Sequence, residues 1–397
     1  MPATTNGKTK ANGKADGENG NKSLLERVEA PSDLPKETRS KIARLEYEFA
    51  RAEFEQLRQS VPKFRPLYEK RNALIASTPE LQGDFWRRVF ANAPAEIDEY
   101  ILPSDAAILG QSLKNLTVER FEVDDQGNGE PRSLRFTFEF ETGDENPYFE
   151  DAKLVKDFYW RREVTRTAKG KRRTWEGLVS EPVRIHWKKD MDPTKGLLDA
   201  ACDLAEAEKK QGTGADRKKL PEYERLVKKV EELEAEKANA EDKDDDDEEG
   251  DDEDPLAGRS PAGVSFFAWF GYRGRDVSAE KSKEAEKEEE ERWAKIAKGE
   301  EVDLDEDDDD DEDDEEEDDL EEAEIFPDGE GLANALAEEL WPNALRYYEQ
   351  SFDIADDDDL GLEELDDDED DDEDEDDEEG EKDEEEEARP RKRVKKT

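Results

Sequence analysis

The first strongly patterned segment of the chain has apolar residues at helical spacing. Residues 37–77 contain few turn-forming residues, and their apolar side chains recur mostly three or four positions apart, at Ile42, Leu45, Phe49, Phe54, Leu57, Val61, Phe64, Tyr68 and Ile75. This spacing predicts a helix of about 40 residues, about 60 Å long at 1.5 Å per residue. A small domain cannot cover a stripe of that length, so we expect the stripe to need a partner.

The middle of this stripe is irregular. Phe49 and Phe54 are five positions apart, and Pro62 and Pro66 should bend the second half, because proline has no N–H to donate. A long regular coiled coil is therefore disfavoured, and we expect a bent helix that pairs with its copy in a second chain. A helix packed only on its own domain is the alternative. The residues expected to form the dimer contact are Ile42, Leu45, Phe49, Leu57, Val61 and Phe64.

Shorter elements follow the long helix. Helices are expected at 84–90 and 105–113, the second with Ser104 or Asp105 as its N-cap. In residues 134–140 phenylalanines alternate with polar residues, which predicts a half-buried strand with one wet face. Further strands are expected at 116–123, 153–163 and 183–187. The sequence thus predicts an α+β fold, with an antiparallel sheet backed by helices on one face.

The apolar pattern weakens after Trp187. Helices are expected at 221–233 and 280–298, and apolar content returns at 332–352, where Pro342 divides the run. We interpret the charged stretches at about 196–260 and 280–324 as insertions that form loops on the rim of the domain.

Between these stretches the segment SFFAWF, residues 265–270, has four aromatic residues and no charge. It predicts a short helix that returns from a charged loop and docks on the domain. The packing residues would be Phe266, Phe267, Trp269 and Phe270. A peptide-binding patch is the alternative.

Charge then divides the chain into a folded body and acidic arms. The 397 residues include 118 acidic and 61 basic side chains, a formal net charge of −57, which excludes a single compact globule built from the whole chain. The acid is concentrated in 303–319 and 366–387, and all seven tryptophans lie outside these runs. We expect a disordered segment at 1–36, the dimerisation helix at 37–80, a folded domain at 81–352 and a disordered acidic tail at 353–397.

The chain has no long apolar stretch and no apolar segment behind the lysines near Met1, so we expect neither a membrane span nor secretion. One cysteine, Cys202, and one histidine, His186, exclude a disulfide framework and a zinc site with several Cys and His ligands. The acidic tail ends in a basic cluster that predicts a nuclear import signal. The alternative is that this basic end partly neutralises the charge of the tail. Its residues are Arg389, Arg391, Lys392, Arg393, Lys395 and Lys396.

Catalytic patterns are missing from the sequence. It contains no G-x-S-x-G, no phosphate-binding G-x-x-x-x-G-K-[ST] and no G-x-G-x-x-G. His186 is interpreted as a structural residue of the expected strand at 183–187. A calcium-loop pattern that begins at Asp245 fails at its twelfth position, Leu256. We therefore predict no enzymatic activity, no cofactor and no specific metal site.

Two charged features point to macromolecular partners. Basic residues cluster around TAKGK, which is expected to be the tip of a hairpin. The cluster allows an auxiliary contact with DNA, and the alternative is a solvated hairpin tip. Its residues are Arg161, Arg162, Arg166, Lys169, Lys171, Arg172 and Arg173. The acidic runs allow cooperative capture of a strongly cationic protein, because their charges lie well within a Debye length of about 8 Å. In a nucleus the abundant cationic proteins are histones. Solubility alone is the alternative role for these runs.

The order of the segments resembles the nucleosome assembly protein family. The matching segments are the long helix leading into LYEKRNALIASTPELQGDFW, then ILPSDAAILGQSLKNLTVERF, FTFEFETGDENPYF, SFFAWF and ELWPNALRYYEQSF. The SFFAWF and LWPNALRYY segments are most similar to the SET (template-activating factor) branch. This resemblance implies a histone chaperone that forms a homodimer through the long helix and carries an earmuff-like domain on each subunit.

The resemblance also implies where histones bind. In the SET branch acidic positions between the SFF-type helix and the WPN segment contribute to the histone surface. Carried to this chain, they correspond to Asp328, Glu330, Glu338 and Glu339. Gly331 stands where that branch tends to have another acid. The resemblance leans toward the tetramer-forming histone pair over the flanking-dimer pair. Its alternative implication is an acidic nuclear inhibitor or adaptor that inhibits a phosphatase or masks histone tails from acetyltransferases.

Overall fold

The computed structural model of the protein describes residues 35–166, 170–212, 217–244, 263–298 and 322–361. One compact unit ends at Ser351, and the chain from Phe352 onward belongs to a second unit. Within the described residues, no helix is both long and apolar enough to cross a lipid bilayer.

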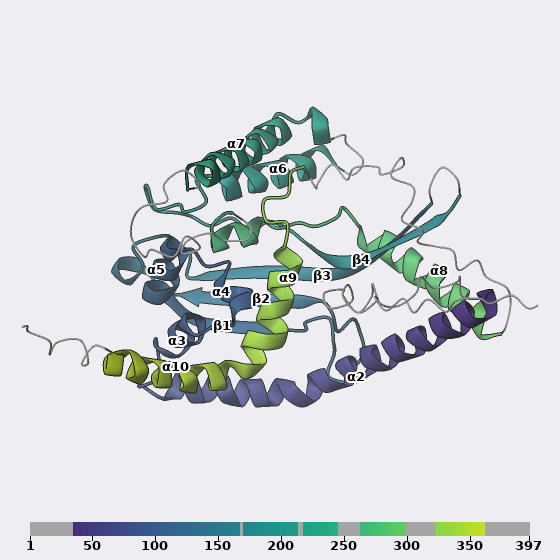
Figure 1. The fold of residues 1–397 in the computed structure, drawn as a ribbon, viewed down its shortest axis with the longest axis horizontal. Coiled ribbons are helices and arrows are strands. Elements are labelled where there is room, and N and C mark those ends of the chain that lie inside the picture. Colours follow the sequence, from purple (N-terminus) through teal and green to yellow (C-terminus); the bar gives the residue numbers. More distant parts are fainter. Residues whose placement is uncertain (1–34, 167–169, 213–216, 245–262, 299–321, 362–397) are drawn as a thin grey trace, which may run out of the picture. The chain divides into compact units, whose positions relative to one another are not determined.

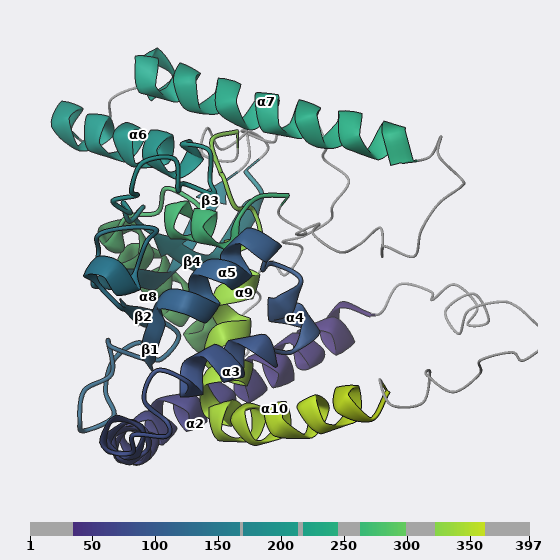
Figure 2. The ribbon, with the colours of Figure 1, turned by 90° about the vertical axis from the view of Figure 1, so that its left-hand side faces the viewer.

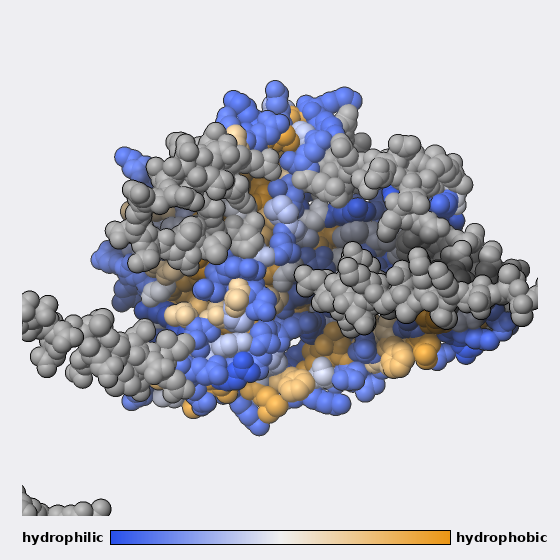
Figure 3. All heavy atoms as spheres, in the orientation of Figure 1, coloured by the Kyte–Doolittle hydropathy of each residue, from blue (hydrophilic) through white to orange (hydrophobic). Residues whose placement is uncertain are grey.

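The predicted long helix is α2, Lys36–Ser77. Its ribbon continues through Pro62 and Pro66 and changes direction along its length (Figure 1). In the space-filling view, apolar residues lie along the edge of the molecule where α2 runs (Figure 3). Tyr68 and Ile75 turn inward toward the core, whereas much of the rest of the stripe is exposed.

The sheet has four antiparallel strands in the order β1-β2-β3-β4, which confirms the predicted α+β fold. The strands are β1 Leu113–Glu119, β2 Leu134–Phe140, β3 Lys153–Arg166 and β4 Arg172–Ser180. Phe138 lies opposite Leu116 on one side and Leu154 on the other, and all three are buried. Figure 1 shows α3 Phe85–Ala91, α5 Pro103–Ser112 and α9 Gly329–Ala335 in front of this sheet.

One predicted strand is shifted along the chain and another was wrong. β1 begins at Leu113 and ends at Glu119, so it lies earlier than the predicted 116–123. Residues 183–187 form no strand; only Trp187 makes an isolated bridge, to Phe149. The reason is that their backbone bonds to separate partners: the Val183 N–H donates to Phe270 O, and His186 O accepts from Glu150 N–H.

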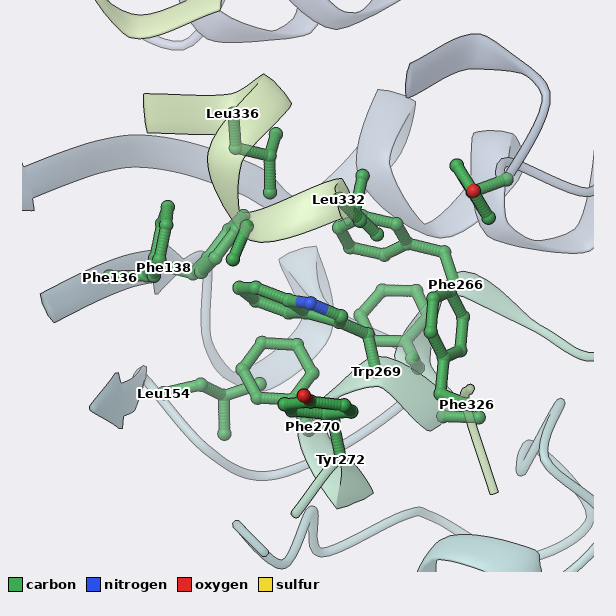
Figure 4. Close-up of a cluster of buried hydrophobic side chains, with 14 of the residues drawn as sticks. Phe136, Phe138, Leu154, Phe266, Trp269, Phe270, Tyr272, Phe326, Leu332 and Leu336 are labelled. Carbon is green, nitrogen blue, oxygen red and sulfur yellow. The ribbon is translucent and has the colours of Figure 1, made fainter. Parts of the chain in front are cut away.

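The aromatic segment 265–270 forms the predicted short helix, a 3₁₀ helix, η3 Phe266–Gly271, whose residues are all buried. The Trp269 ring centroid lies 5.1 Å from those of Phe136 on β2 and Phe158 on β3. Figure 4 shows Trp269 at the centre of this cluster, beneath Leu332 of α9. The packing role predicted for the aromatic residues is confirmed.

Buried charged side chains hold both ends of η3. At its start, the Asp105 carboxylate accepts the N–H of Phe266 at 2.8 Å and the Ser265 hydroxyl at 2.5 Å. At its end, Lys156 Nζ donates to the carbonyls of Phe270 at 3.0 Å and Tyr272 at 2.7 Å. Burial lowers the pKa of Lys156 to about 7.

Asp105 is therefore not the N-cap of its helix, and neither is Ser104. α5 begins at Pro103, so both residues lie in its first turn. From there Asp105 Oδ2, the oxygen that accepts the N–H of Phe266, also accepts the N–H of Leu102 at 3.0 Å. Burial raises the pKa of Asp105, and the hydrogen bonds from Ser265, Phe266 and Leu102 oppose that rise. The prediction of a cap was wrong because the helix begins at Pro103, which places Leu102 at the N-cap and Asp105 at the third helical position.

The stretch predicted as a rim insertion begins with a core helix. α6 Leu197–Gln211 packs on η3 and buries Leu197, Leu198 and Leu204, so the loop interpretation was wrong for these residues. α7 Pro221–Asp244 contains the helix predicted at 221–233, and α8 Ala279–Ala297 matches the one predicted at 280–298 to within one residue at each end. Figures 1 and 2 show α6 and α7 side by side. The acidic residues 245–254 and 303–319 lie outside the described residues.

The last helical run continues through Pro342. α9 is followed by a π-helix, η5 Leu336–Leu340, and then by α10 Trp341–Gly361. Proline has no N–H, and a wide π turn lies directly before it, where a regular helical bond would be lost. The Asn343 side chain donates to the Glu339 carbonyl at 2.9 Å, which satisfies an oxygen in this turn. The expected division at Pro342 thus takes the form of a π turn.

Candidate functional site

The start of α9 is fixed by the aromatic core. Trp269 Nε1 donates to the carbonyl of Gly329 at 2.9 Å, and Gly329 lies between the predicted acids Asp328 and Glu330. A Cβ at position 329 would lie 2.3 Å from the Tyr272 ring, so only glycine permits this close approach. The η3 aromatics therefore set the position of the acidic segment.

Asp328 is exposed and is held by a neutral donor. The hydroxyl of Tyr100, a buried residue, donates to Asp328 Oδ2. Burial, followed by this bond to Asp328, raises the pKa of Tyr100 above its usual range. No ion pair to Asp328 occurs among the residues that the structure describes. Its charge is thus fixed in place but not neutralised.

Glu330 is half-buried beside β4. It accepts the backbone N–H of Leu178, and burial raises the pKa of its carboxyl group. A Cβ at Gly177 would lie 2.8 Å from Glu330 Oε2, so the strand backbone closely approaches this carboxylate. Glu330 also has no cationic partner within the described ranges.

The remaining two predicted acids, Glu338 and Glu339, lie in the π turn and contact different neighbours. Glu338 Oε1 is 3.0 Å from Arg120 Nη2, so its charge is paired. Glu339 Oε1 accepts the Tyr347 hydroxyl at 2.5 Å. Burial, followed by the bond to Glu339, raises the pKa of Tyr347 to about 12. The structure therefore separates Glu338 from the three predicted acids that neutral donors hold.

Acids on α4 Ala95–Asp98 and just after it join this set, although the sequence reasoning missed them. α4 packs against α9 with Ile97 and Tyr100 buried. Glu99 acts electrostatically on Tyr100, and Glu96 acts on Tyr347. Neither glutamate has an ion pair within the part of the chain described. The pattern AEIDEY, with apolar residues inward and acids outward, is the signal that identifies them.

The predicted dimer residues line the outer side of α2. Leu57 and Val61 are half-buried in a groove of about 730 Å³ between α2, the end of β1 and the start of α10. Leu67 and Leu74 extend the exposed stripe, at 52% and 53% exposure, and the prediction missed both. The other four predicted residues are strongly exposed: Ile42 42%, Leu45 54%, Phe49 62% and Phe64 50%.

The basic hairpin is folded against acidic side chains. Arg166 Nη2 lies 2.8 Å from Glu288 on α8, and Arg172 pairs with Glu288 and Glu289. Arg162 donates to Glu176 on β4 at 2.7 Å. Lys169 lies outside the described residues, as do the basic cluster 389–396 and the calcium-like pattern at 245–256.

The single cysteine and the single histidine are not among the residues brought together here. Cys202 is buried in α6, and burial raises the pKa of its thiol to about 11. His186 is exposed, and its Nδ1 lies 2.8 Å from Asp151 Oδ1; it is not a strand residue, contrary to the prediction. Among the described residues no cluster of His, Cys, Asp and Glu is arranged to hold a metal.

Residues 83–351 match the nucleosome assembly protein (NAP) family. The chain is 34% identical over 159 residues to a protein named for nucleosome assembly in Schizosaccharomyces pombe, covering 40% of this chain and 58% of that protein. It is 32% identical over 152 residues to Protein SET of Drosophila melanogaster, covering 38% and 49%. The chain thus spans about half the length of these relatives. The crystal structure of Ccp1 aligns with a TM-score of 0.43 at 23% identity, over 80% of this chain and 96% of that one.

Proposed function

This chain belongs to the nucleosome assembly protein family, and on that premise we propose that it is a histone chaperone that captures core histones on an acidic face and releases them to DNA without ATP. The observation that carries this proposal is the set of carboxylates that are fixed but not neutralised. Asp328, Glu330 and Glu339 are held by two tyrosine hydroxyls and a backbone N–H. Glu96 and Glu99 lie on the adjoining α4 segment.

The mechanism requires no bond chemistry, and we propose that the protein is not an enzyme. Carboxylates held by neutral donors keep their full charge and lose little side-chain freedom when a lysine or arginine arrives. The acidic runs 303–319 and 366–387 would speed the encounter by long-range attraction, while the folded face supplies selectivity. Release follows when DNA phosphates compete better for the histone cations.

The test neutralises the face without changing its shape. The triple variant Asp328→Asn, Glu330→Gln, Glu339→Gln should bind histones about tenfold or more weakly at about 0.15 M salt, since three contacts of about 0.5–1 kcal/mol each are lost. The control, Asp144→Asn, Glu145→Gln, Glu150→Gln, removes the same charge from exposed acids elsewhere. Both histone pairs are titrated, and we expect the tetramer-forming pair to bind more tightly. Equal affinities for the two triple variants would overturn the site.

We further propose that two copies pair through α2 in opposite directions. Ile42 and Leu74 lie equally far from Arg58 along the helix, as do Phe49 and Leu67. Antiparallel pairing centred on Arg58 therefore brings Ile42 against the partner's Leu74, and Phe49 against the partner's Leu67. Such a pairing is isologous and closes into a dimer.

Charge supports the same direction. In this register Glu48 and Glu55 of one copy lie within about 3 Å, along the axis, of Lys70 and Lys63 of the other. The same register also sets Arg58 beside its own copy and Arg51 opposite Arg65. A parallel pairing would set every charged residue of α2 beside its own copy, and like charges repel. Sequence and exposure thus both favour the antiparallel dimer.

We also propose that the protein works in the nucleus. The basic cluster 389–396 is the sequence feature that supports import. A fluorescent fusion that lacks residues 389–397 should lose nuclear accumulation, whereas unchanged accumulation would remove the cluster from that role.

A further inference from the structure

The β3–β4 hairpin has a basic surface that the proposed histone face does not use. On a chain with a net charge of −57, the described part of this hairpin concentrates cations on two adjacent strands. Arg166 lies directly opposite Arg172, and Arg173 lies opposite Thr165. The basic residues are Arg161, Arg162, Arg166, Lys171, Arg172 and Arg173.

An acidic helix covers this surface. Glu288 on α8 lies 2.8 Å from Arg166 and 3.5 Å from Arg172 Nε, and Glu289 pairs with Arg172 Nη2. The Arg172 and Glu289 side chains are only 8% and 12% exposed, so this pair is largely removed from solvent. Arg166 and Arg172 of the hairpin thus both donate to carboxylates of α8.

Contacts outside these ion pairs hold α8 in place. Ser282 accepts the backbone N–H of Arg162 at 3.1 Å, and Lys281 pairs with Glu163 at 3.3 Å. At the other end of α8, the Trp293 ring stacks on Tyr47 of α2, with centroids 4.1 Å apart and planes at 12°. Figure 1 shows α8 running from the hairpin toward the start of α2. The helix is therefore docked at both ends.

The carboxylates of α8 occupy the donors that a phosphate would use. A guanidinium presents the same planar set of N–H groups to a carboxylate and to a phosphate. Glu288 and Glu289 therefore compete with any phosphate for Arg166 and Arg172. The competition is intramolecular, so the local carboxylate concentration is high.

We propose that the basic hairpin is a binding surface for the phosphates of duplex DNA, and that α8 covers it. While α8 is docked, the protein stays off DNA. When α8 is released, the hairpin cations bind the DNA backbone without sequence preference. This inference goes beyond the proposed function and does not rest on it, because its residues lie outside the α4–α9 face.

The test uses the full chain and a short fluorescein-labelled DNA duplex of mixed sequence. Glu288→Gln, Glu289→Gln should bind the duplex about tenfold more tightly than the unmodified protein at about 0.05 M salt. The salt slope should steepen by about two, since each phosphate contact contributes about 0.9. The matched control is Glu284→Gln, Glu290→Gln, which removes the same charge from exposed positions of the same helix.

A second variant releases α8 without changing its charge. Trp293→Ala removes the stack on Tyr47 and should also increase DNA affinity. Equal DNA affinity for the two glutamine variants would overturn the proposal, because charge alone would then explain any gain. An unchanged affinity for Trp293→Ala would overturn the covering role of α8. Histone titration of the same samples should give unchanged affinity, which separates this proposal from the chaperone proposal.

Discussion

The antiparallel pairing of α2 makes a prediction that cysteine cross-linking tests directly. In the proposed register, position 49 of one copy faces position 67 of the other. Position 49 lies 18 residues before position 67, which is about 27 Å of helix. Two copies of position 49 are therefore about 27 Å apart along the axis, far beyond the limit of about 7 Å between Cα atoms joined by a disulfide.

The assay compares three variants on a non-reducing gel after mild oxidation. Phe49→Cys, Leu67→Cys should form a covalent dimer, whereas Phe49→Cys alone should not. Phe49→Cys, Leu74→Cys is the register control, because its cysteines miss each other by seven residues, about 10 Å. The background is low because Cys202 is 4% exposed and burial raises its pKa to about 11, so little reactive thiolate forms.

Each alternative gives a different result. Cross-linking of the Phe49→Cys single variant would refute the antiparallel direction. A Phe49→Cys, Leu67→Cys variant that sediments as a dimer but does not cross-link would refute the register centred on Arg58. A chain that sediments as a monomer at micromolar concentration would refute the dimer. None of these results depends on histone binding, which is measured separately.

Three further predictions concern the acidic face and the core beneath it. The double variant Tyr100→Phe, Tyr347→Phe should weaken histone binding about threefold to tenfold, because the side chains of Asp328 and Glu339 regain conformational freedom. The salt dependence of binding should not change, since the charge stays constant. Tyr148→Phe is the control, and a changed salt dependence would contradict the positioning role of the two tyrosines. Trp269→Ala should lower the free energy of unfolding in urea by about 3–5 kcal/mol, since this fully buried indole fills the core and bonds Gly329; a loss below about 1 kcal/mol would contradict it. Burial raises the pKa of Glu330, so the folded state binds a proton at this carboxylate more readily than the unfolded state does. The charged carboxylate therefore destabilises the folded state at pH 7. This destabilisation disappears as pH falls through the raised pKa. Glu330→Gln should therefore raise the melting temperature at pH 7 more than at pH 4, and an equal effect at both pH values would refute the burial argument.

Part of the fold follows from the sequence because local pattern and tertiary packing agree. In β2, the alternation of phenylalanines with Arg135 and Glu139 predicts both ends of the strand, although its second face is half-buried rather than wet and Thr137 on it is buried. The segment at 265–270 is equally predictable, because four adjacent aromatic residues between charged blocks must be buried somewhere. The match over residues 83–351 confirms the family that the order of these segments resembles.

Other elements depend on contacts that no local pattern contains. α6 looks like the beginning of a charged insertion, yet its alanines and leucines pack on η3, a segment far along the chain. Residues 183–187 alternate like a strand, but their backbone bonds to Phe270 and to the loop before β3 rather than to a ladder. Asp105 is predicted as a possible cap; it bonds the N–H of Leu102 at the start of its own helix, and also that of Phe266, which only the folded core brings near.

For the acidic face too, the sequence predicts the positions of the acids, but not the partners that they contact in the fold. The sequence resemblance selects Asp328, Glu330, Glu338 and Glu339 as one group, because they lie in the stretch that matches the acidic positions of the SET branch. In the folded chain their partners differ: Arg120 neutralises Glu338, while Tyr100 and Tyr347 hold Asp328 and Glu339 with neutral hydroxyls. Proximity in sequence predicts where acid accumulates, whereas the partner of each carboxylate decides which charges remain available to a histone. This is why the α4 acids, distant in sequence and without ion pairs in the described structure, fit the proposed surface better than Glu338 does.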